Sequence, residues 1–410
     1  MKRSTAFQSR RIQSVAKGIF LICFCIGLPG LYLEAQEVSE DHVITRCLAT
    51  EPFQESTEGL GTLFYTANSE SADRFDMLYR YEVATGNSTS VERNITAVAI
   101  SQGNDLIVTR VPDPAYVWPT GQPRSTEEEA TLARTLPAFY ARVHNRQGNL
   151  IAEHEWLPSW TNSLGWVNNS EILIGYKGFR TNLFALNVIS GEERSLVTLY
   201  TLSDVNPLNF WARADGYGRY VAYVGDRDYG ADHHIGLGIV SLLDGTLVWA
   251  GPSSINAQVA HITGISWSPD GSKLVYVDQA QNLNQIRYWS ANSRQIETLS
   301  TWPDDEENYI DIHDLTWSPT NDSIAYWRIS GTGTNKAARL YITSLETGLT
   351  VDYCISASPS GNSLVWSPDG LRMAIWSSFA EWPTLILETE TGVRHTTEHN
   401  LGRWVAWLSE

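Results

Sequence analysis

Histidine and aspartate recur where two apolar strands are predicted to begin. His261 precedes ITGISW, and Asp311 and His313 lie in IDIHDLTW. Imidazole and carboxylate groups that meet at one site can bind a transition metal or act as base and acid. No H-x-H pair lies on one predicted strand, so a solvated polar lining is the alternative interpretation.

Carboxylates also gather in two short segments. Asp226, Asp228 and Asp232 surround a glycine in DRDYGAD, and oxygen ligands at this spacing can wrap a calcium ion. The segment lacks a distal bidentate glutamate, so an acidic hairpin loop without metal is the favoured interpretation. The segment 303–314, PDDEENYIDIHD, places six carboxylates in twelve residues, which is typical of a solvated face.

Aromatic side chains lie in the longer predicted connections. Exposed aromatic rings bind sugars, peptide side chains or cations. The alternative for each ring is that it packs its own loop onto the scaffold, and we expect two or three of the six to be exposed. The candidates for ligand binding are Tyr116, Trp118, Trp156, Trp160, Trp302 and Trp382.

A repeated hairpin must position these residues. ISWSPDGSKLVYV at 265–277 returns as LTWSPTNDSIAYW at 315–327 and as LVWSPDGLRMAIW at 364–376. In its turn, proline sets φ, aspartate bonds to nearby backbone and glycine accepts a positive φ. With degenerate copies included, the repeats are centred on Ile100, Trp166, Trp211, Trp267, Trp317, Trp366 and Trp407.

A second series of seven turns interleaves with the first. These turns are Thr85-Gly86, Gln147-Gly148, Ser190-Gly191, Asp244-Gly245, Asn292-Ser293, Thr347-Gly348 and Thr391-Gly392. Each unit therefore has two hairpins and four strands, and its nearly continuous apolar runs are typical of strands covered on both faces. Such units, repeated every 40–50 residues or so, predict an all-β, seven-bladed β-propeller of four-stranded blades.

The two ends of the repeat array complement each other. The first unit begins at 61–67, GTLFYTA, without an inner strand, and the last is an orphan inner strand, Gly402 to Leu408. Adding this C-terminal strand to the first blade closes the ring and removes an exposed edge. Six blades, with one degenerate copy misassigned, are the less favoured alternative. A β-solenoid would need shorter and more uniform turns.

Strand order in such a ring places both series of short turns on one face. The longer connections fall on the opposite face, where loops on a rigid scaffold usually bind ligands. The longest is 111–138, which contains STEEEATLARTL, a predicted short helix capped by Ser125. This insertion is a lid, an arm packed on a neighbouring blade, or a contact to another subunit.

The W-S-P-D-G hairpins at 267–271 and 366–370, with the altered W-S-P-T-N at 317–321, resemble the TolB-like, WD-related propeller repeats. Similar repeats form the non-catalytic propeller of prolyl-oligopeptidase-type peptidases, in which a hydrolase domain follows. The sequence has no G-x-S-x-G elbow and nothing follows Glu410, so we expect no attached peptidase domain. The resemblance implies a binding or scaffolding ring, and it assigns no site because the motif residues build the turn.

The first 35 residues differ from the rest. Basic residues precede an apolar run from Gly18 to Leu33, which ends Leu33-Glu34-Ala35 in the pattern of a secretory signal peptide. An uncleaved anchor is the alternative, although glycines and a proline interrupt the run and about 20 apolar residues are needed to span a bilayer. We expect a signal peptide at 1–35, a leader segment at 36–58 and a propeller at 59–410, with no stable membrane span after cleavage.

Charge and cysteine content agree with export. The net charge of −17 repels phosphate backbones, so nucleic acid is excluded as a partner. Only Cys47 and Cys354 remain after the predicted cleavage, and two cysteines in an exported protein usually pair. Their separation in sequence does not show that they meet. We hypothesise a disulfide that ties the leader to the closing seam, a loop closure worth about 4–5 kcal/mol in the chain-entropy model.

These patterns predict an exported protein, periplasmic or secreted, that recognises a protein or a glycan through its long-loop face without catalysis or cofactor. The alternative is a carbohydrate-active lyase or hydrolase that uses His261, His313 and Asp311 at the channel mouth. Some seven-bladed lyases acting on acidic sugars have a histidine-rich metal site there. A part in a larger envelope assembly is a third possibility. If Ca²⁺ is bound, the expected site is the carboxylate segment with Asp226, Asp228 and Asp232. If a transition metal is bound, the expected site is the histidine and aspartate group.

Overall fold

A computed structural model of the chain describes residues within 43–409, and its described segments form seven β-sheets and no helix. None of the described residues therefore lies in a helix of the length and apolarity that a bilayer requires. The predicted signal peptide and the predicted helix after Ser125 lie outside the described residues. The described segments are 43–47, 50–52, 61–68, 76–101, 103, 106–113, 139–156, 165–176, 180–200, 211–226, 235–250, 264–280, 283–303, 311–320, 322–331, 336–358, 362–377, 384–397 and 402–409.

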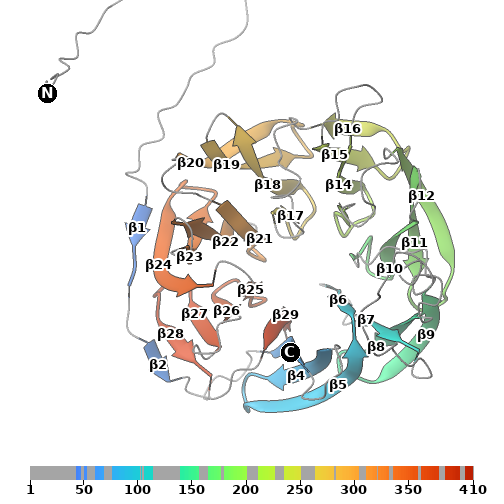
Figure 1. The fold of residues 1–410 in the computed structure, drawn as a ribbon, viewed down its shortest axis with the longest axis horizontal. Helices are drawn as coiled ribbons and strands as arrows, with labels where there is room; N and C mark the ends of the chain where they lie inside the picture. Colours follow the sequence, from blue (N-terminus) through green and yellow to red (C-terminus); the bar gives the residue numbers. More distant parts are fainter. Residues whose placement is uncertain are drawn as a thin grey trace, which may run out of the picture. The chain divides into compact units, whose positions relative to one another are not determined.

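The seven sheets follow one another around a ring, as Figure 1 shows, which confirms the predicted seven-bladed propeller. The strands of each blade are given from inner to outer. Blade 1 is β29 (Arg403–Leu408), β3 (Thr62–Asn68), β4 (Asp76–Glu82) and β5 (Asn87–Ile95), and blade 2 is β6 (Ala97–Ile100), β7 (Ile107–Pro112), β8 (Phe139–His144) and β9 (Leu150–Trp156). Blade 3 is β10 (Glu171–Tyr176), β11 (Arg180–Asn187) and β12 (Glu193–Tyr200), and blade 4 is β13 (Trp211–Ala214), β14 (Tyr220–Asp226), β15 (Ile235–Ser241) and β16 (Leu247–Ala250).

Blades 5 to 7 complete the ring. Blade 5 is β17 (Ile265–Trp267), β18 (Lys273–Ala280), β19 (Leu283–Ser290) and β20 (Ile296–Pro303). Blade 6 is β21 (Asp311–Trp317), β22 (Ser323–Ser330), β23 (Ala337–Ser344), β24 (Thr350–Ala357) and β1 (Val43–Thr45). Blade 7 is β25 (Asn362–Trp366), β26 (Arg372–Ser377), β27 (Leu385–Glu388), β28 (Arg394–Thr396) and β2 (Thr50–Pro52).

The C-terminal strand closes the ring as the sequence predicts. β29 is the inner strand of blade 1 and pairs antiparallel with β3, from Arg403 opposite Thr66 to Leu408 opposite Thr62. The first and last segments of the propeller therefore share one sheet, and β3 has a neighbour on each side.

Three blades depart from the predicted four strands. In blade 3 the described inner segment is reduced to one bridge, between Trp166 and Ile172. Blades 6 and 7 each gain a fifth strand, because β1 pairs parallel with β24 and β2 pairs parallel with β28. The leader is therefore part of two sheets. This pairing could not be predicted from the sequence, because strands of three residues are too short to show an alternating pattern.

The hydrophobic core is divided among the blade interfaces. The buried apolar side chains of the described residues form seven clusters, and each cluster joins two neighbouring blades. Trp404 and Trp407 of β29 join Ala374 and Ile386 of blade 7 in the cluster that crosses the closing seam. Both faces of the blades are thus covered, which explains the continuous apolar runs in the sequence.

A series of indole hydrogen bonds connects the inner strands of blades 4 to 7. The repeat tryptophans of blades 5, 6 and 7 each donate their Nε1–H to a backbone carbonyl of the preceding inner strand. The accepting residue lies just before the last residue of that strand. The bonds are Trp267 to Arg213 O (3.0 Å), Trp317 to Ser266 O (2.9 Å) and Trp366 to Thr316 O (3.4 Å). The turn of blade 4 begins at Asp215, so Ala214 rather than Trp211 holds the repeat position there.

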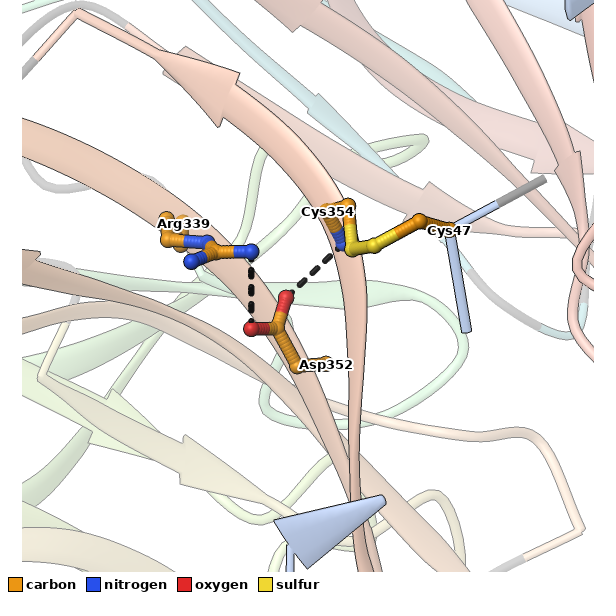
Figure 2. The surroundings of a disulfide bond; sticks show 4 residues. All are labelled: Cys47, Arg339, Asp352 and Cys354. Atoms are coloured by element: carbon orange, nitrogen blue, oxygen red, sulfur yellow. Dashed lines mark hydrogen bonds and ion pairs between the residues drawn. A yellow bond between two sulfur atoms is a disulfide. The ribbon is translucent and has the colours of Figure 1, made fainter. Parts of the chain in front are cut away.

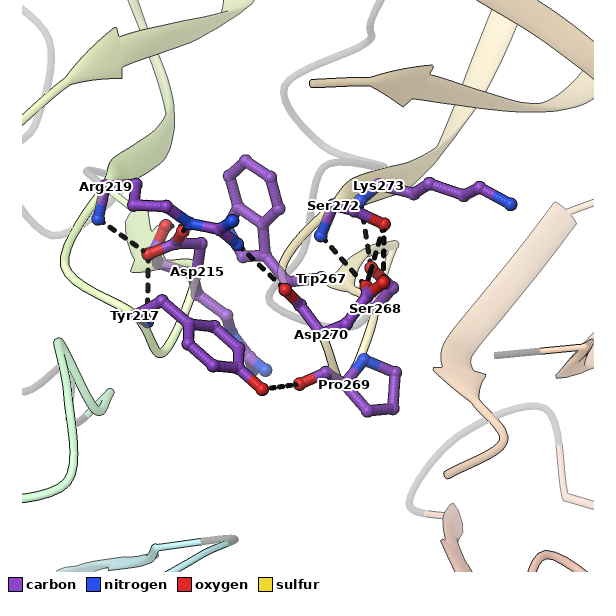
Figure 3. Close-up of polar contacts among 10 residues, drawn as sticks. Asp215, Tyr217, Arg219, Trp267, Ser268, Pro269, Asp270, Ser272 and Lys273 are labelled. Atoms are coloured by element: carbon purple, nitrogen blue, oxygen red, sulfur yellow. Dashed lines mark hydrogen bonds and ion pairs between the residues drawn. The ribbon is translucent and has the colours of Figure 1, made fainter. Parts of the chain in front are cut away.

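The W-S-P-D-G turn is held by its own side chains and by the neighbouring blade. Ser268 Oγ donates to Asp270 Oδ1 (2.6 Å) and accepts the Lys273 N–H (2.9 Å). Figure 3 shows the turn of blade 4 docked on it: Arg219 Nη2 donates to Asp270 O (2.8 Å) and Tyr217 O–H donates to Pro269 O (3.0 Å). Its motif residues therefore act in blade packing.

The two faces of the ring differ in the lengths of their connections. In blades 2, 4, 5, 6 and 7, the turn between the first and second strands and the turn between the third and fourth strands each have five or six residues. Connections on the opposite side, called here the loop face, range from one residue between β5 and β6 to 26 residues between β7 and β8. Length variation is thus confined to one face.

We predict that Trp317→Phe lowers the free energy of unfolding more than Trp289→Phe does. Both side chains are almost fully buried, but only the Trp317 indole has a hydrogen bond to the preceding blade, since the Trp289 Nε1 has no partner among the described residues. The excess, about 1–2 kcal/mol for an orphaned carbonyl of Ser266, is measured by urea unfolding. Equal losses in the two variants would contradict the role assigned to the indole bond.

Gly271→Ala should cost more stability than Gly348→Ala. Both glycines have positive φ, +64° and +67°, so alanine pays the left-handed penalty of about 1–2 kcal/mol at each. A Cβ at Gly271 would also lie 2.4 Å from Arg219 Nη2 and 2.8 Å from Asp215 O, whereas a Cβ at Gly348 meets nothing within 4 Å. Thermal unfolding of the two variants measures the blade-to-blade contact, and indistinguishable midpoints would refute it.

Candidate functional site

Five ionisable residues of blades 6 and 1 lie on strands whose first residues face the loop side of the ring. Asp311, His313 and Asp314 lie on β21, Arg403 begins β29, and Asp76 begins β4. Burial raises the carboxyl pKa of both Asp314 and Asp76, and the positive charge of Arg403 opposes the rise in each. We call these five residues the inner-strand cluster, because four of them lie on the inner strands β21 and β29, and Asp76 lies on the third strand of blade 1.

His313 is paired with a buried carboxylate. Its Nε2 lies 2.8 Å from Asp311 Oδ2, and the Asp311 side chain is 8% exposed while that of His313 is 24% exposed. Burial lowers the pKa of His313, but the bond to Asp311 and the charges of Asp311 and Asp314 outweigh it, so the pKa is raised. A partly exposed imidazole oriented by a carboxylate can donate hydrogen bonds, carry positive charge or move a proton.

Asp314 has an unusual backbone and an unusual carboxyl. β21 changes register against β22 between His313 and Thr316, and Asp314 has a φ of +55° in this bulge. Bulges re-aim side chains, and aspartate is among the few residues that tolerate the left-handed region. Burial raises the carboxyl pKa to about 6 despite the opposing charges of His313 and Arg403. The bulge therefore holds a carboxyl in surroundings that disfavour its ionised form.

Asp76 extends this behaviour to blade 1. Burial raises its carboxyl pKa, and the charge of Arg403 opposes the rise. The charge of one guanidinium therefore opposes the raised pKa values of two carboxyls, one in blade 6 and one in blade 1. Such a mixed set offers donors and acceptors to a polar ligand, but the described residues include no group of three His, Cys, Asp or Glu side chains suited to a metal ion.

The structure places two of the predicted aromatic platforms inside the protein. Trp156 is 1% exposed and Trp302 is 9% exposed. Trp156 packs between blades 2 and 3, with the guanidinium of Arg110 5.7 Å from its ring centroid, and Arg328 lies 4.2 Å from the Trp302 centroid. Neither ring is a platform for a ligand, because each fills a blade interface under a cation. Tyr116, Trp118, Trp160 and Trp382 lie outside the described residues.

The metal-site candidates are described only in part. Asp226 ends β14, and Asp228, Asp232 and His261 lie outside the described residues. The predicted meeting of His261 with His313 and Asp311 therefore stays a prediction, as does the calcium loop. Of the predicted catalytic alternatives, the structure brings together His313 and Asp311.

Cys47 and Cys354 are joined by a disulfide that spans 307 residues of sequence, with their Cα atoms 5.1 Å apart. Figure 2 shows the bond between the leader and the outer strand of blade 6. The bond lies at the outer edge of the ring, away from β21 and β29, the inner strands that carry four of the five residues of the inner-strand cluster.

Sequence reasoning missed Arg403 and Asp76. The signal for Arg403 was its position at the start of the orphan C-terminal strand, since closure places that start beside the starts of the other inner strands. Asp76 had no comparable signal, because a lone aspartate at the start of a second-hairpin strand is common on propeller surfaces.

No protein-family model matches the chain. The curated protein Prolyl endopeptidase FAP of Bos taurus is 26% identical over 185 residues, which span 41% of this chain and 22% of that protein. The chain thus covers about a fifth of the length of this curated relative.

Solved structures similar to the chain include propellers of different kinds. An oligogalacturonate lyase in complex with manganese is 12% identical, with a TM-score of 0.51, over 82% of this chain and 87% of that one. TolB from Acinetobacter baumannii is 12% identical, with a TM-score of 0.44, over 84% and 83%. At these identities the likeness shows the fold alone, a β-propeller.

Asp314→Asn should stabilise the protein above about pH 6. Because the folded pKa of about 6 exceeds the ordinary aspartate value of 3.8, the folded state binds more protons between these values, and its stability falls as pH rises through them. Asparagine tolerates the positive φ and does not ionise. We expect a gain of about 1–2 kcal/mol at pH 7–8 that vanishes below about pH 4.

Asp322→Asn is the matched control for this prediction. Burial opposes ionisation of Asp322, but hydrogen bonds from Ser318, Thr320 and Ser323 outweigh it and lower the carboxyl pKa. Its stabilisation is present above the unfolded pKa and is lost as pH falls through the folded pKa, so the variant should be destabilised at neutral pH. Urea unfolding from pH 4 to 8 checks both signs. A neutral-pH loss of stability in Asp314→Asn would contradict the account.

Proposed function

We propose that the protein is an exported recognition propeller that binds a protein or a glycan on its loop face, without catalysis. The observation that carries this proposal is the inner-strand cluster, in which a partly exposed His313 is paired with Asp311 on the face where connection lengths vary, and Arg403 of blade 1 acts electrostatically on Asp314 of blade 6. The opposite face has a structural role instead, because its short turns form hydrogen bonds between neighbouring blades.

The chemistry of the cluster suits a polar ligand. His313 and Arg403 donate hydrogen bonds, and Asp311, Asp314 and Asp76 accept them, so hydroxyls, amides and ammonium groups all find partners. Rigid strands hold these groups, so less conformational entropy is lost when a ligand binds. Tyr116, Trp118, Trp160 and Trp382 are the remaining aromatic candidates for contacts around the cluster.

The proposal of export depends on the N-terminal sequence. Residues 1–35 have the basic, apolar and small-residue regions of a signal peptide. A disulfide in the propeller is consistent with an oxidising compartment, periplasmic or extracellular.

One observation favours a second candidate, a carbohydrate-active lyase or hydrolase. His313 and Asp311 form a pair in which the carboxylate can orient the imidazole as a general base. The oligogalacturonate lyase among the similar structures was solved with manganese, and a metal here would need His261 or another ligand beside His313.

Array binding with mature protein tests the first proposal. Residues 36–410 are probed on glycan and peptide arrays, and each hit is measured again with His313→Gln and with Glu346→Gln, an exposed position in a turn of the opposite face. We expect at least a tenfold loss of affinity for His313→Gln and no change for Glu346→Gln. Hits that ignore His313 but respond to Glu346 would overturn the assignment of the face.

Incubation of each glycan hit with the protein separates the two candidates. Recognition predicts that mass spectrometry finds the glycan unchanged, with or without added Mn²⁺ or Ca²⁺. Cleavage that is lost in His313→Gln would reject the non-catalytic proposal in favour of the enzyme.

A further inference from the structure

The leader is held to the ring by few contacts. β1 pairs with β24 over three residues, from Val43 opposite Thr350 to Thr45 opposite Asp352, and β2 pairs with β28 over three residues. Ile44 is 44% exposed, and Val43 is only partly buried against the core. Little apolar surface therefore holds β1 in place, and its attachment depends on backbone hydrogen bonds and the disulfide.

The contacts around Cys47 join blade 6 to blade 7. The Arg46 N–H donates to Asp352 O of β24 (2.8 Å), and Arg46 Nη1 donates to Glu390 O in the last turn of blade 7 (2.7 Å). Cys47 is exposed and bonds to Cys354 of β24. The leader thus crosses the outer side of one blade interface.

Cys354 is displaced from its sheet. The pairing of β23 with β24 shifts register between Arg339 and Tyr341, where Tyr353, Cys354 and Ile355 lie opposite the single residue Leu340. Within this bulge Cys354 has a φ of +55°, a region that side chains without a short polar group rarely adopt.

Asp352 maintains the bulge from within β24. Its Oδ1 accepts the Cys354 N–H (2.8 Å) and its Oδ2 pairs with Arg339 Nη2 (2.9 Å), as Figure 2 shows. An irregular backbone that persists only because its surroundings enforce it is a frequent property of switch regions. The bulge presents the Cys354 sulfur to the leader at the outer edge.

Ring closure does not use the leader. The closing seam depends on the pairing of β29 with β3 and on the cluster formed by Trp404 and Trp407 with blade 7. Loss of β1 and β2 would leave the four propeller strands of blades 6 and 7 paired as in a blade without a fifth strand.

We propose that the Cys47–Cys354 disulfide is a reducible latch that holds the leader on blades 6 and 7 and releases it, with the ring still folded, when a dithiol reduces the bond. A thiolate of the dithiol attacks one sulfur to form a mixed disulfide, and the second thiol resolves it. Two electrons pass to the protein, which gains two thiols, and the dithiol becomes a cyclic disulfide. The exposed position of Cys47 gives the reductant access.

Opening the latch moves the point at which the N-terminal residues join the ring. Among the described residues, the first strand paired with the ring is β1 on blade 6 with the latch closed, and β3 on blade 1 with the latch open. The edges of β24 and β28 lose their parallel neighbours at the same time. The device would therefore couple the redox state of the compartment to the length of the N-terminal extension.

Hydrogen exchange read by mass spectrometry tests the latch on the oxidised protein, residues 36–410, before and after dithiothreitol without denaturant. We expect free thiols at both positions, exchange at least tenfold faster in peptides that cover 43–52, and unchanged exchange in β22 and β26. The proposal is overturned if the bond resists dithiothreitol in the folded protein, if the leader stays protected after reduction, or if β22 and β26 lose protection with it.

Two variants sharpen this test. Cys47→Ser combined with Cys354→Ser should exchange in 43–52 like reduced wild type; if this variant does not fold, reduction of folded wild type decides alone. Oxidised Arg46→Gln loses the side-chain interactions of Arg46 with Glu390 O and Tyr353 but keeps the disulfide and the Arg46 N–H bond to Asp352 O, so its leader should stay protected within about threefold of wild type. Full release in oxidised Arg46→Gln would show that Arg46, and not the disulfide, is the latch.

Discussion

Closure of the ring by the C-terminal strand is the constraint on which the rest of the structure depends. Each interface between blades buries one apolar cluster of the described residues, so no blade has a complete core of its own. The pairing of β29 with β3 places Trp404 and Trp407 against blade 7, which completes the last of these interfaces. The same pairing gives blade 1 its inner strand, so β3 is no longer an edge strand as it would be in an open array.

The same closure assembles the inner-strand cluster. The charge of Arg403 acts on Asp314 and Asp76 because closure places the C-terminal strand in blade 1, at the centre of the ring. The bulge at Asp314 and its poorly solvated carboxyl oppose stability, while the paired His313 and Asp311 are well satisfied. Local features that oppose stability on an otherwise regular scaffold are expected where the scaffold serves a ligand.

Much of the architecture could be predicted from the sequence because the turn chemistry repeats. The seven copies, the interleaved second series and the orphan strand 403–408 all follow from proline, glycine and apolar spacing. The same logic places His313 and Asp311 at a strand start. It fails where a feature has no period: β1 and β2 are three residues each, and the bulges at Asp314 and Cys354 depend on contacts made across sheets.

Burial of single tryptophans was also beyond sequence reasoning. Trp156 and Trp302 stand at the ends of outer strands, where exposure and packing are equally compatible with the pattern. Arg110 and Arg328, from other strands, cover them and decide the matter. The register of blade 4 was misplaced by three residues for a related reason, because Trp211 resembles the repeat tryptophan while Ala214 occupies its place.

The carboxyl titration of Asp314, followed by NMR in wild type and in Arg403→Gln, tests most directly whether closure builds the cluster. The account predicts an apparent pKa near 6 in wild type and a higher value once the guanidinium of β29 is removed. A pKa near 4 that Arg403→Gln leaves unchanged would mean that Asp314 is solvated and uncoupled from blade 1. The candidate site would then lose its physical basis.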